Sequence, residues 1–371
     1  MNKVSLSLMD KLRVIPDPRN NKGKKYRLET ILFISLCAVI SGADSWVGIE
    51  RFGKLKKEWL AQFVDLSEGI PSHDTIGRTF CLLEPEAFRK EILQWIQEVS
   101  QKSRGKIIAI DGKSLRRSYD QNRAQKMLHL VHAWASENHF LLGEVKTDEK
   151  SNEITAIPEL LKMLALEGAI VTVDAMGTQT DIAERIHKAK GDYVMALKGN
   201  QGTAHQEVKQ YWQDKQLCQE AACHETIEKG HGRIEERQYR ISEDIDWFED
   251  RQIWKGLKSI GYVESKRTVN GKTTVEHRYY LSSLKANAQE FAEAVRAHWG
   301  VENSLHWVLD VSFREDESRV RIGHAAQNFS LLRKTALMML KEDQVSKSSI
   351  KGKRLEAAWN SDYLEKVIFR G

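Results

Sequence analysis

The sequence of 371 residues has few cysteines, no long apolar run and no apolar leader at its start. Its four cysteines, Cys37, Cys81, Cys218 and Cys223, are too few and too scattered for a disulfide framework, so we expect a reducing compartment. The longest apolar run, residues 31–40, is about half of the roughly 20 residues that a membrane helix needs. The first residues lack the pattern of a secretory signal. We therefore expect a cytoplasmic protein.

Hydrophobic residues make up 41% of the chain and charged residues 29%, which is typical of a folded globular protein and excludes disorder as the dominant state. The net charge of +5 is unevenly distributed. Residues 1–57 carry 12 Lys and Arg against 5 Asp and Glu, and residues 319–371 carry 11 against 5, so the middle of the chain is acidic. This pattern suits a protein that holds a polyanion with its two ends, although solvated surface helices would show the same pattern.

The first hundred residues have the apolar spacing of helices. The spacing predicts helices over 28–40, 46–59 and 86–99, and Ser72 is a candidate N-cap for a further helix. We therefore predict an N-terminal helical domain over residues 1–104.

From residue 105 onward, short apolar strands alternate with amphipathic helices. The strands are predicted at 107–110, 128–135, 139–145, 169–173 and 193–197, and the helices at 157–166, 181–188, 288–307 and 325–340. This order indicates an α/β domain with a mixed sheet over residues 105–371. Residues 220–286 are mostly strand-like, with a hairpin turn at Val269–Lys272, and form a predicted β-rich insertion.

Two of the predicted strands end in an aspartate, Asp111 and Asp174. A carboxylate at the end of a buried strand is costly unless something compensates it, and a divalent cation does so well. Because ligands gather at the carboxyl ends of strands in open α/β sheets, the two aspartates are candidates for one metal site. The alternative is that each caps a turn, since Asp111-Gly112 is a common turn pair.

A third carboxylate is available in the predicted helix around residues 296–307. Arg296, Trp299, Glu302 or Asn303, and His306 fall near one helix face at spacings of three and four residues. The alternative is an ordinary amphipathic helix with its tryptophans buried and its polar groups in water.

Several blocks of the sequence resemble bacterial insertion-sequence transposases of the DDE type, nearest to the H-repeat-associated group. The blocks are IPDPRNNKGKKYRLETILFISLCAVISGADSW, GIPSHDTIGR, IAIDGKSLRRSYD, TDEKSNEITAIPELL, IVTVDAMGTQTDIAERI, DYVMALKGNQ, HGRIEER and VRAHWGVENSLHWVLDVSFREDESRVRIGHAAQNFSLLRK. Together they span nearly the whole chain.

The resemblance implies an RNase H-like catalytic core in which Asp111, Asp174 and Glu302 are the catalytic carboxylates and bind two Mg²⁺ ions, with Mn²⁺ as a substitute. It also implies that the β-rich insertion precedes the helix of the glutamate. Relatives often carry Tyr-x2-Arg-x3-Glu-x6-Lys on that helix. This sequence has Val295, His298 and Leu309 at the Tyr, Arg and Lys positions, which puts the phosphate and base contacts of that helix in doubt.

Three other acids are rivals for the third catalytic position, namely Asp310, Glu315 and Asp316. Asp310 lies eight residues after Glu302, which is about 12 Å along a continuous helix, so it cannot take the place of Glu302 in one pocket.

The activity implied by the resemblance is cleavage of DNA at the ends of a mobile element and strand transfer into target DNA by a two-metal mechanism. The partners would be double-stranded DNA and a second copy of the chain in a synaptic homodimer, in the bacterial cytoplasm near the nucleoid. Basic, amide and aromatic side chains near the triad are candidate DNA contacts, with surface exposure, turn chemistry or core packing as the alternative for each. They are Lys113, Arg116, Lys198, Asn200, Gln201, His231, Arg233, Arg296, His298, Trp299 and Asn303.

The N-terminal domain is the candidate for binding the element ends, because Lys22, Lys24, Lys25 and Arg27 cluster beside Tyr26. Two other functions stay open from the sequence. One is a transposase-derived DNA-binding protein that is no longer mobile, and the other is a standalone RNase H-like nuclease.

Overall fold

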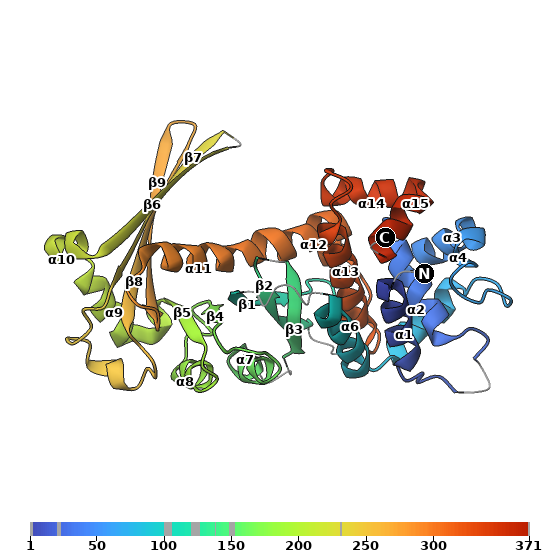
Figure 1. The fold of residues 1–371 in the computed structure, drawn as a ribbon, viewed down its shortest axis with the longest axis horizontal. Helices are drawn as coiled ribbons and strands as arrows, with labels where there is room; N and C mark the ends of the chain where they lie inside the picture. The colour runs from blue at the N-terminus through green and yellow to red at the C-terminus, as the bar shows by residue number, and fades with distance from the viewer. Residues whose placement is uncertain are drawn as a thin grey trace.

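The computed structural model describes residues 3–20, 24–99, 106–119, 127–137, 139–147, 153–230 and 232–369. A helical body, a central sheet and a long β arm follow one another along the longest axis (Figure 1). His231, one of the predicted DNA contacts, and Lys22 of the N-terminal cluster lie outside the described residues. None of the described helices is both long enough and apolar enough to cross a bilayer.

The N-terminal helices include the predicted ones, but the helix at 3–14 was not predicted and the helix predicted over 46–59 is divided into two at Lys56. They are α1 (Lys3–Val14), α2 (Leu28–Ile40), α3 (Trp46–Leu55), α4 (Lys57–Leu60), α5 (His73–Leu82) and α6 (Pro85–Val99). Nearly every residue of α2 is buried, because the helix is apolar on all sides and other helices surround it. The hydroxyl of Ser72 accepts a hydrogen bond from the amide of Thr75, which confirms the predicted N-cap of α5.

The last three helices of the chain pack onto these first ones. They are α13 (Ala325–Glu342), α14 (Ile350–Trp359) and α15 (Ser361–Phe369). One apolar core contains side chains from both ends of the chain, such as Phe33, Phe329 and Phe369. Buried Asn328 of α13 donates to the carbonyl oxygens of Phe80 and Leu83, at 3.0 and 2.7 Å. The two basic ends of the sequence therefore meet in the same helical body (Figure 1).

The described strands form one nine-stranded sheet with the order β3-β2-β1-β4-β5-β9-β8-β7-β6. Its first five strands are β1 (Ile107–Ser114), β2 (His129–Ala135), β3 (Phe140–Lys146), β4 (Ile170–Val173) and β5 (Asp192–Leu197). Strands β1, β4 and β5 are parallel, β2 pairs antiparallel with β1, and β3 pairs antiparallel with β2, which confirms the mixed sheet. Between them lie α7 (Glu153–Lys162) and α8 (Thr180–Lys188), with α7 four residues earlier than predicted.

Strand β1 differs from its predicted extent, because it does not end before Asp111 but continues to Ser114. The continuation pairs with β2 over its whole length, and Asp111 lies opposite His132. Backbone pairing with β2 thus outweighs the turn tendency of Asp111-Gly112. The side chains of Asp111 and Lys113, two residues apart on the strand, consequently point to the same face of the sheet.

The remaining strands form an arm that extends from the edge of β5 (Figure 1). They are β6 (Ala222–Gly230), β7 (Arg233–Ser242), β8 (Ser259–Val269) and β9 (Lys272–Ser282), all antiparallel to their neighbours. The hairpin turn falls at Asn270-Gly271, where both residues have positive φ angles, as a type I′ turn requires. Helices α9 (Gly202–Tyr211) and α10 (Lys215–Glu220) connect β5 to the arm.

A long helical segment joins the arm to the helical body across one face of the sheet (Figure 1). It consists of α11 (Ala288–Val301), a π-helical turn η5 (Glu302–His306) and α12 (Trp307–Phe313). Ala294 and Val295 of α11 pack in one core cluster with Ile107 of β1 and Ile170 of β4. This packing sets Glu302 at the carboxyl ends of these two strands.

Candidate active site

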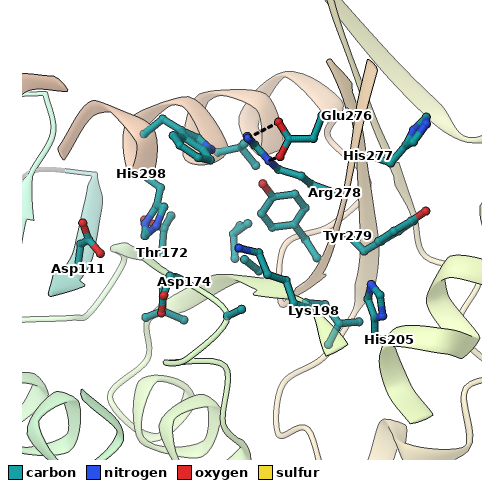
Figure 2. A pocket seen from close by; sticks show the side chains of 18 of the residues that line it. Asp111, Thr172, Asp174, Lys198, His205, Glu276, His277, Arg278, Tyr279 and His298 are labelled. Atoms are coloured by element: carbon teal, nitrogen blue, oxygen red, sulfur yellow. Dashed lines mark hydrogen bonds and ion pairs between the residues drawn. The ribbon is translucent and has the colours of Figure 1, made fainter. Parts of the chain in front are cut away.

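Asp111, inside β1, and Asp174, directly after β4, follow aligned residues of two neighbouring parallel strands. Ile110 of β1 is aligned with Val173 of β4, so the next residue of each strand is one of the two aspartates. Asp174 follows the end of β4, and its Oδ1 accepts a hydrogen bond of 3.0 Å from the amide of Gly177. Both aspartates line one cleft (Figure 2).

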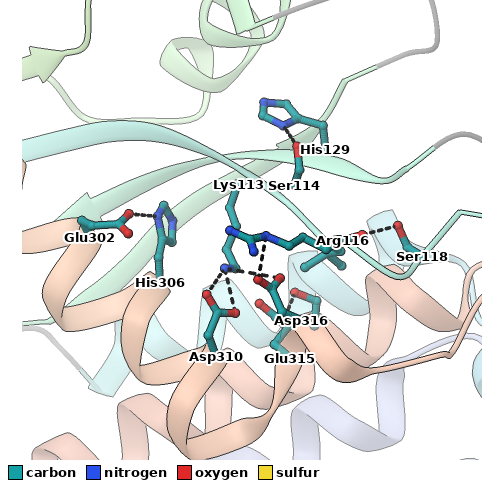
Figure 3. A network of polar contacts seen from close by, with 12 residues as sticks. Lys113, Ser114, Arg116, Ser118, His129, Glu302, His306, Asp310, Glu315 and Asp316 are labelled. Atoms are coloured by element: carbon teal, nitrogen blue, oxygen red, sulfur yellow. Dashed lines mark hydrogen bonds and ion pairs between the residues drawn. The ribbon is translucent and has the colours of Figure 1, made fainter.

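Glu302 reaches the same cleft from the long helical segment that crosses the sheet. It is the first residue of the π-helical turn η5. Its carboxylate lies 3.2 Å from Nδ1 of His306, and Oδ2 of Asp111 lies 3.3 Å from the same nitrogen. The three side chains offer ligand atoms that all lie within 4.8 Å of one another. Glu302 is largely exposed, whereas His306 is buried (Figure 3).

The pKa values of these groups follow from burial and from their mutual contacts. Burial alone lowers the pKa of His306, but its hydrogen bonds to Asp111 and Glu302 outweigh burial and the net pKa is raised. Burial would raise the pKa of Asp111, yet the contact with His306 lowers it overall. The pKa of Asp174 is raised, first by burial and then by the negative charges of Glu153 and Asp111. The site thus concentrates negative charge that one imidazole only partly offsets.

The chemistry of this donor set fits a divalent cation. Carboxylate oxygens are the preferred ligands of Mg²⁺, and Mn²⁺ accepts both carboxylates and imidazole. Ligand atoms of Asp111, Glu302 and His306 lie within 4.8 Å of one another, and the negative charge of Asp111 raises the pKa of Asp174. A cation would relieve the repulsion between these carboxylates.

The cleft that Asp111, Asp174 and Glu302 line has a volume of about 630 Å³. It is bounded by the β arm as well as by the core. His205 of α9 and Glu276, Arg278 and Tyr279 of β9 face it from the arm side (Figure 2). The sequence did not single out these residues, because only the pairing of β5 with β9 brings the arm to the triad. A substrate in the cleft would therefore touch core and arm together.

His298, a residue of α11 that the sequence predicts to contact DNA, lies near both Asp111 and Asp174. Its Nδ1 is 3.1 Å from Oγ1 of Thr172, a residue of β4. Burial lowers the pKa of His298 more than the charges of Asp111 and Asp174 raise it. A neutral His298 is therefore part of the cleft wall (Figure 2).

Lys113 is a predicted DNA contact that the structure places in an internal ion pair (Figure 3). Its side chain is buried, and Nζ donates to both carboxylate oxygens of Asp310 at 2.7 and 2.9 Å. Arg116 is exposed and pairs with Asp316 at 3.1 Å. The third rival acid, Glu315, is buried and accepts a hydrogen bond from Ser330. All three rivals of Glu302 are thus engaged away from the cation donors.

Two of the predicted amide contacts hold the loop that follows Asp174. Asn200 donates to the carbonyl oxygen of Ala175 at 2.6 Å, and Gln201 donates to that of Thr178 at 2.7 Å. These bonds tie the short helix η3 (Gly199–Gln201) to the end of β4. Lys198, the residue before η3, is exposed and lines the cleft (Figure 2).

The other predicted DNA contacts surround a second cavity of about 420 Å³ between α11 and the arm. Arg233 contacts Glu235 at 2.9 Å, and Arg296 donates to Glu228 at 2.7 Å. Exposed Trp299 stacks under the guanidinium of Arg278, which lies 4.0 Å from the ring. Asn303 also lines this cavity.

Two family models match the chain along most of its length. A model described as "Transposase DDE domain" matches residues 102–339, and one described as "DDE_Tnp_1-associated" matches residues 9–96. The chain belongs to the DDE transposase family. It is 44% identical over 367 residues to "Putative transposase YncI" of Escherichia coli O157:H7, covering 98% of this chain and 94% of that protein. It is 41% identical to "H repeat-associated putative transposase YhhI" of Escherichia coli strain K12, covering 97% of each.

Membership of the DDE transposase family agrees with the resemblance seen in the sequence and supports transposition in general as the function. The matched DDE segment contains Asp111, Asp174 and Glu302. The structure adds His306 to this group. The sequence places it on the same helix face as Glu302 but indicates no role for it. Its spacing of four residues from Glu302 was the available signal.

Proposed function

We propose that this transposase cleaves DNA at the ends of its element and joins them to target DNA, with Asp111, Asp174 and Glu302 as catalytic carboxylates. The observation that carries the proposal is that these three carboxylates, from β1, the loop after β4 and η5, line one wide cleft, where ligand atoms of Asp111 and Glu302 lie within 4.8 Å of each other. The strand order β3-β2-β1-β4-β5 supports an RNase H-like core, and β6–β9 would be the insertion of the family over about 220–286.

The three carboxylates would hold Mg²⁺ or Mn²⁺, two ions in the full site. When bound, divalent cations activate an attacking oxygen and stabilise the negative charge on the leaving oxygen of a phosphodiester. The residues of this chain supply the rest. The Asp111 and Asp174 side chains are set by strand register, and Glu302 is brought to them by helix packing.

The walls of the cleft would orient the DNA strand through charge and stacking. Exposed Lys198 lies beside Asp174 and would contact a phosphate, and Arg116, Arg233 and Arg296 would bind phosphates further along. Trp299 presents an exposed ring that would stack on a base. We keep Lys113, Asn200, Gln201, His231, His298 and Asn303 as further candidates.

The helical body is our candidate for binding the element ends, because both basic ends of the chain contribute to it. Exposed Arg27 and Lys25 lie on it, each within 3.8 Å of a glutamate. We propose a domain of residues 1–104 for this task and a catalytic domain of residues 105–371. Two copies on a pair of DNA ends would form a homodimeric synaptic complex.

The test is a strand-transfer assay on DNA that carries the sequences flanking the gene, with Mg²⁺ and a target plasmid. Asp111→Asn, Asp174→Asn and Glu302→Gln should each lower cleavage and joining by about 100-fold or more, because each removes cation-binding charge. DNA binding in EDTA should stay close to that of the wild type. Asp181→Asn, on the exposed surface of α8, is the matched control.

The outcomes separate the proposed function from its alternatives. Cleavage without joining would indicate a nuclease, and DNA binding without cleavage would indicate a protein that is no longer mobile. Full cleavage by any of the three triad variants would refute the assignment of that residue. A Lys198→Ala variant should weaken DNA binding and lower the slope of log affinity against log salt by about 1.

A further inference from the structure

The π-helical turn orients the side chains of Glu302 and His306 differently from a regular α-helix. The amide of Trp307 donates to the carbonyl oxygen of Glu302, five residues back, which marks the wider turn. Such turns inside α-helices recur at functional sites. Here the turn places His306 within 3.3 Å of Asp111 on the neighbouring strand and within 3.2 Å of Glu302.

His306 bridges two carboxylates that differ greatly in freedom. The Asp111 side chain is 24% exposed and comes from the sheet, whereas the Glu302 side chain is 61% exposed on a helix surface. A glutamate at such a surface samples several rotamers, and fixing one of them costs conformational entropy. Nδ1 of His306, at 3.2 Å, is the contact that holds Glu302 next to Asp111.

His306 itself is held in place by a buried polar row. Its ring lies 5.5 Å from that of His132, which is paired with Asp111 across β1 and β2. Nε2 of His132 is 3.1 Å from Glu144 on β3, and Nζ of Lys334 on α13 donates to the same carboxylate. All these side chains are at most 3% exposed. His306 therefore has little room to adopt another position.

We propose that His306 is a positioning residue that turns Glu302 toward Asp111 and so assembles the cation site before the cation binds. The row of His132, Glu144 and Lys334 is its support. The inference rests on the proposed function, because it takes Asp111 and Glu302 as the residues that hold the cation.

The experiment is a Mn²⁺ titration of the full-length protein without DNA, with free Mn²⁺ followed by electron paramagnetic resonance. His306→Leu replaces the buried imidazole by an apolar side chain of similar size, which cannot donate a hydrogen bond. We expect it to bind Mn²⁺ about 10–100-fold more weakly, which is the usual effect of losing an outer partner of a metal ligand. His306→Gln keeps a donor and should retain most of the affinity.

Two results would overturn the inference. One is His306→Leu binding Mn²⁺ as tightly as the wild type does. The other is His306→Gln binding as weakly as His306→Leu, because the imidazole itself and not its hydrogen bond would then be required. If His306→Leu fails to fold by circular dichroism, Glu302→Asp tests the same point at an exposed position, since the shorter side chain no longer reaches His306. Wild-type affinity in Glu302→Asp would likewise overturn it.

Asp111→Asn separates this inference from the proposed function. If Asp111→Asn loses Mn²⁺ binding and His306→Leu does not, only the role of His306 fails. If Asp111→Asn binds Mn²⁺ as the wild type does, the cation site itself is wrong.

Discussion

Lys334→Met is the substitution whose effect the structure defines best. Lys334 of α13 and Glu144 of β3 form an ion pair in which each side chain is 1% exposed. Removing the lysine leaves the carboxylate buried, with only His132 beside it at 3.1 Å. Methionine fills a similar volume, so the change removes a charge and leaves little cavity.

Two estimates of the loss in the free energy of unfolding caused by Lys334→Met agree. Burial tends to raise the pKa of Glu144, but the charge of Lys334 and the contact with His132 lower it from 4.5 to about 2. That shift corresponds to about 3 kcal/mol of stability, since one unit is about 1.4 kcal/mol. Breaking a buried ion pair by removing one partner costs about 3–5 kcal/mol. We therefore expect Lys334→Met to lower the free energy of unfolding by at least about 3 kcal/mol.

The assay is urea unfolding followed by far-ultraviolet circular dichroism between pH 7.5 and pH 3. Because the pKa of Glu144 is lowered in the folded state, its stabilising effect is present above pH 4.5 and is lost as the pH falls toward 2. The difference between wild type and Lys334→Met should thus be widest near neutral pH and should narrow in acid, where protonation removes the buried charge.

The double variant Glu144→Gln with Lys334→Met provides the control for a charge effect. It buries no unpaired charge at this place, so it should be more stable than Lys334→Met alone. A loss below about 1 kcal/mol in Lys334→Met, or strictly additive losses in the double variant, would refute the reasoning.

Three further substitutions test the packing that positions the site. Gly261→Ala should cost about 1–3 kcal/mol in urea unfolding, because its Cβ would lie 2.3 Å from the buried ring of Phe291, whereas Gly199→Ala, with open space around it, should cost less. Ser72→Ala should cost about 1 kcal/mol of stability by removing the N-cap of α5, and an unchanged unfolding midpoint would contradict that role. Asn328→Leu should cost about 1–3 kcal/mol or more, because it leaves buried carbonyl oxygens without a donor, and faster hydrogen exchange at the end of α5 would localise the loss.

The sequence predicted those elements whose signal is local. Two short apolar stretches separated by a polar turn located β2 and β3, and Asn270-Gly271 located the hairpin turn, since these patterns depend only on neighbouring residues. The extent of β1 was wrong, because pairing with β2 lies outside any local window. Asp111 and Asp174 could be chosen because each follows a short apolar run, which is visible in the sequence.

Other features of the site depended on contacts between distant segments. The engagement of Lys113 with Asp310 joins residues that are 197 positions apart, and no periodicity reveals such a pair. The arm residues that line the cleft, such as Arg278, reach it only because β9 pairs with β5. His306 had the right spacing from Glu302, but its contact with Asp111 depends on how the helix lies over the sheet.

The sequence by itself determined the family and the α/β class, because these depend on residue types in local order, and it predicted the three carboxylates through the resemblance to that family. Only the tertiary structure shows that the two basic ends pack into one helical body and that the β arm forms part of the cleft wall. It also decided which acids are neutralised internally and which converge. The physical reason is that burial and ion pairing are set by segments far apart in the chain, as in the contact of Lys113 with Asp310.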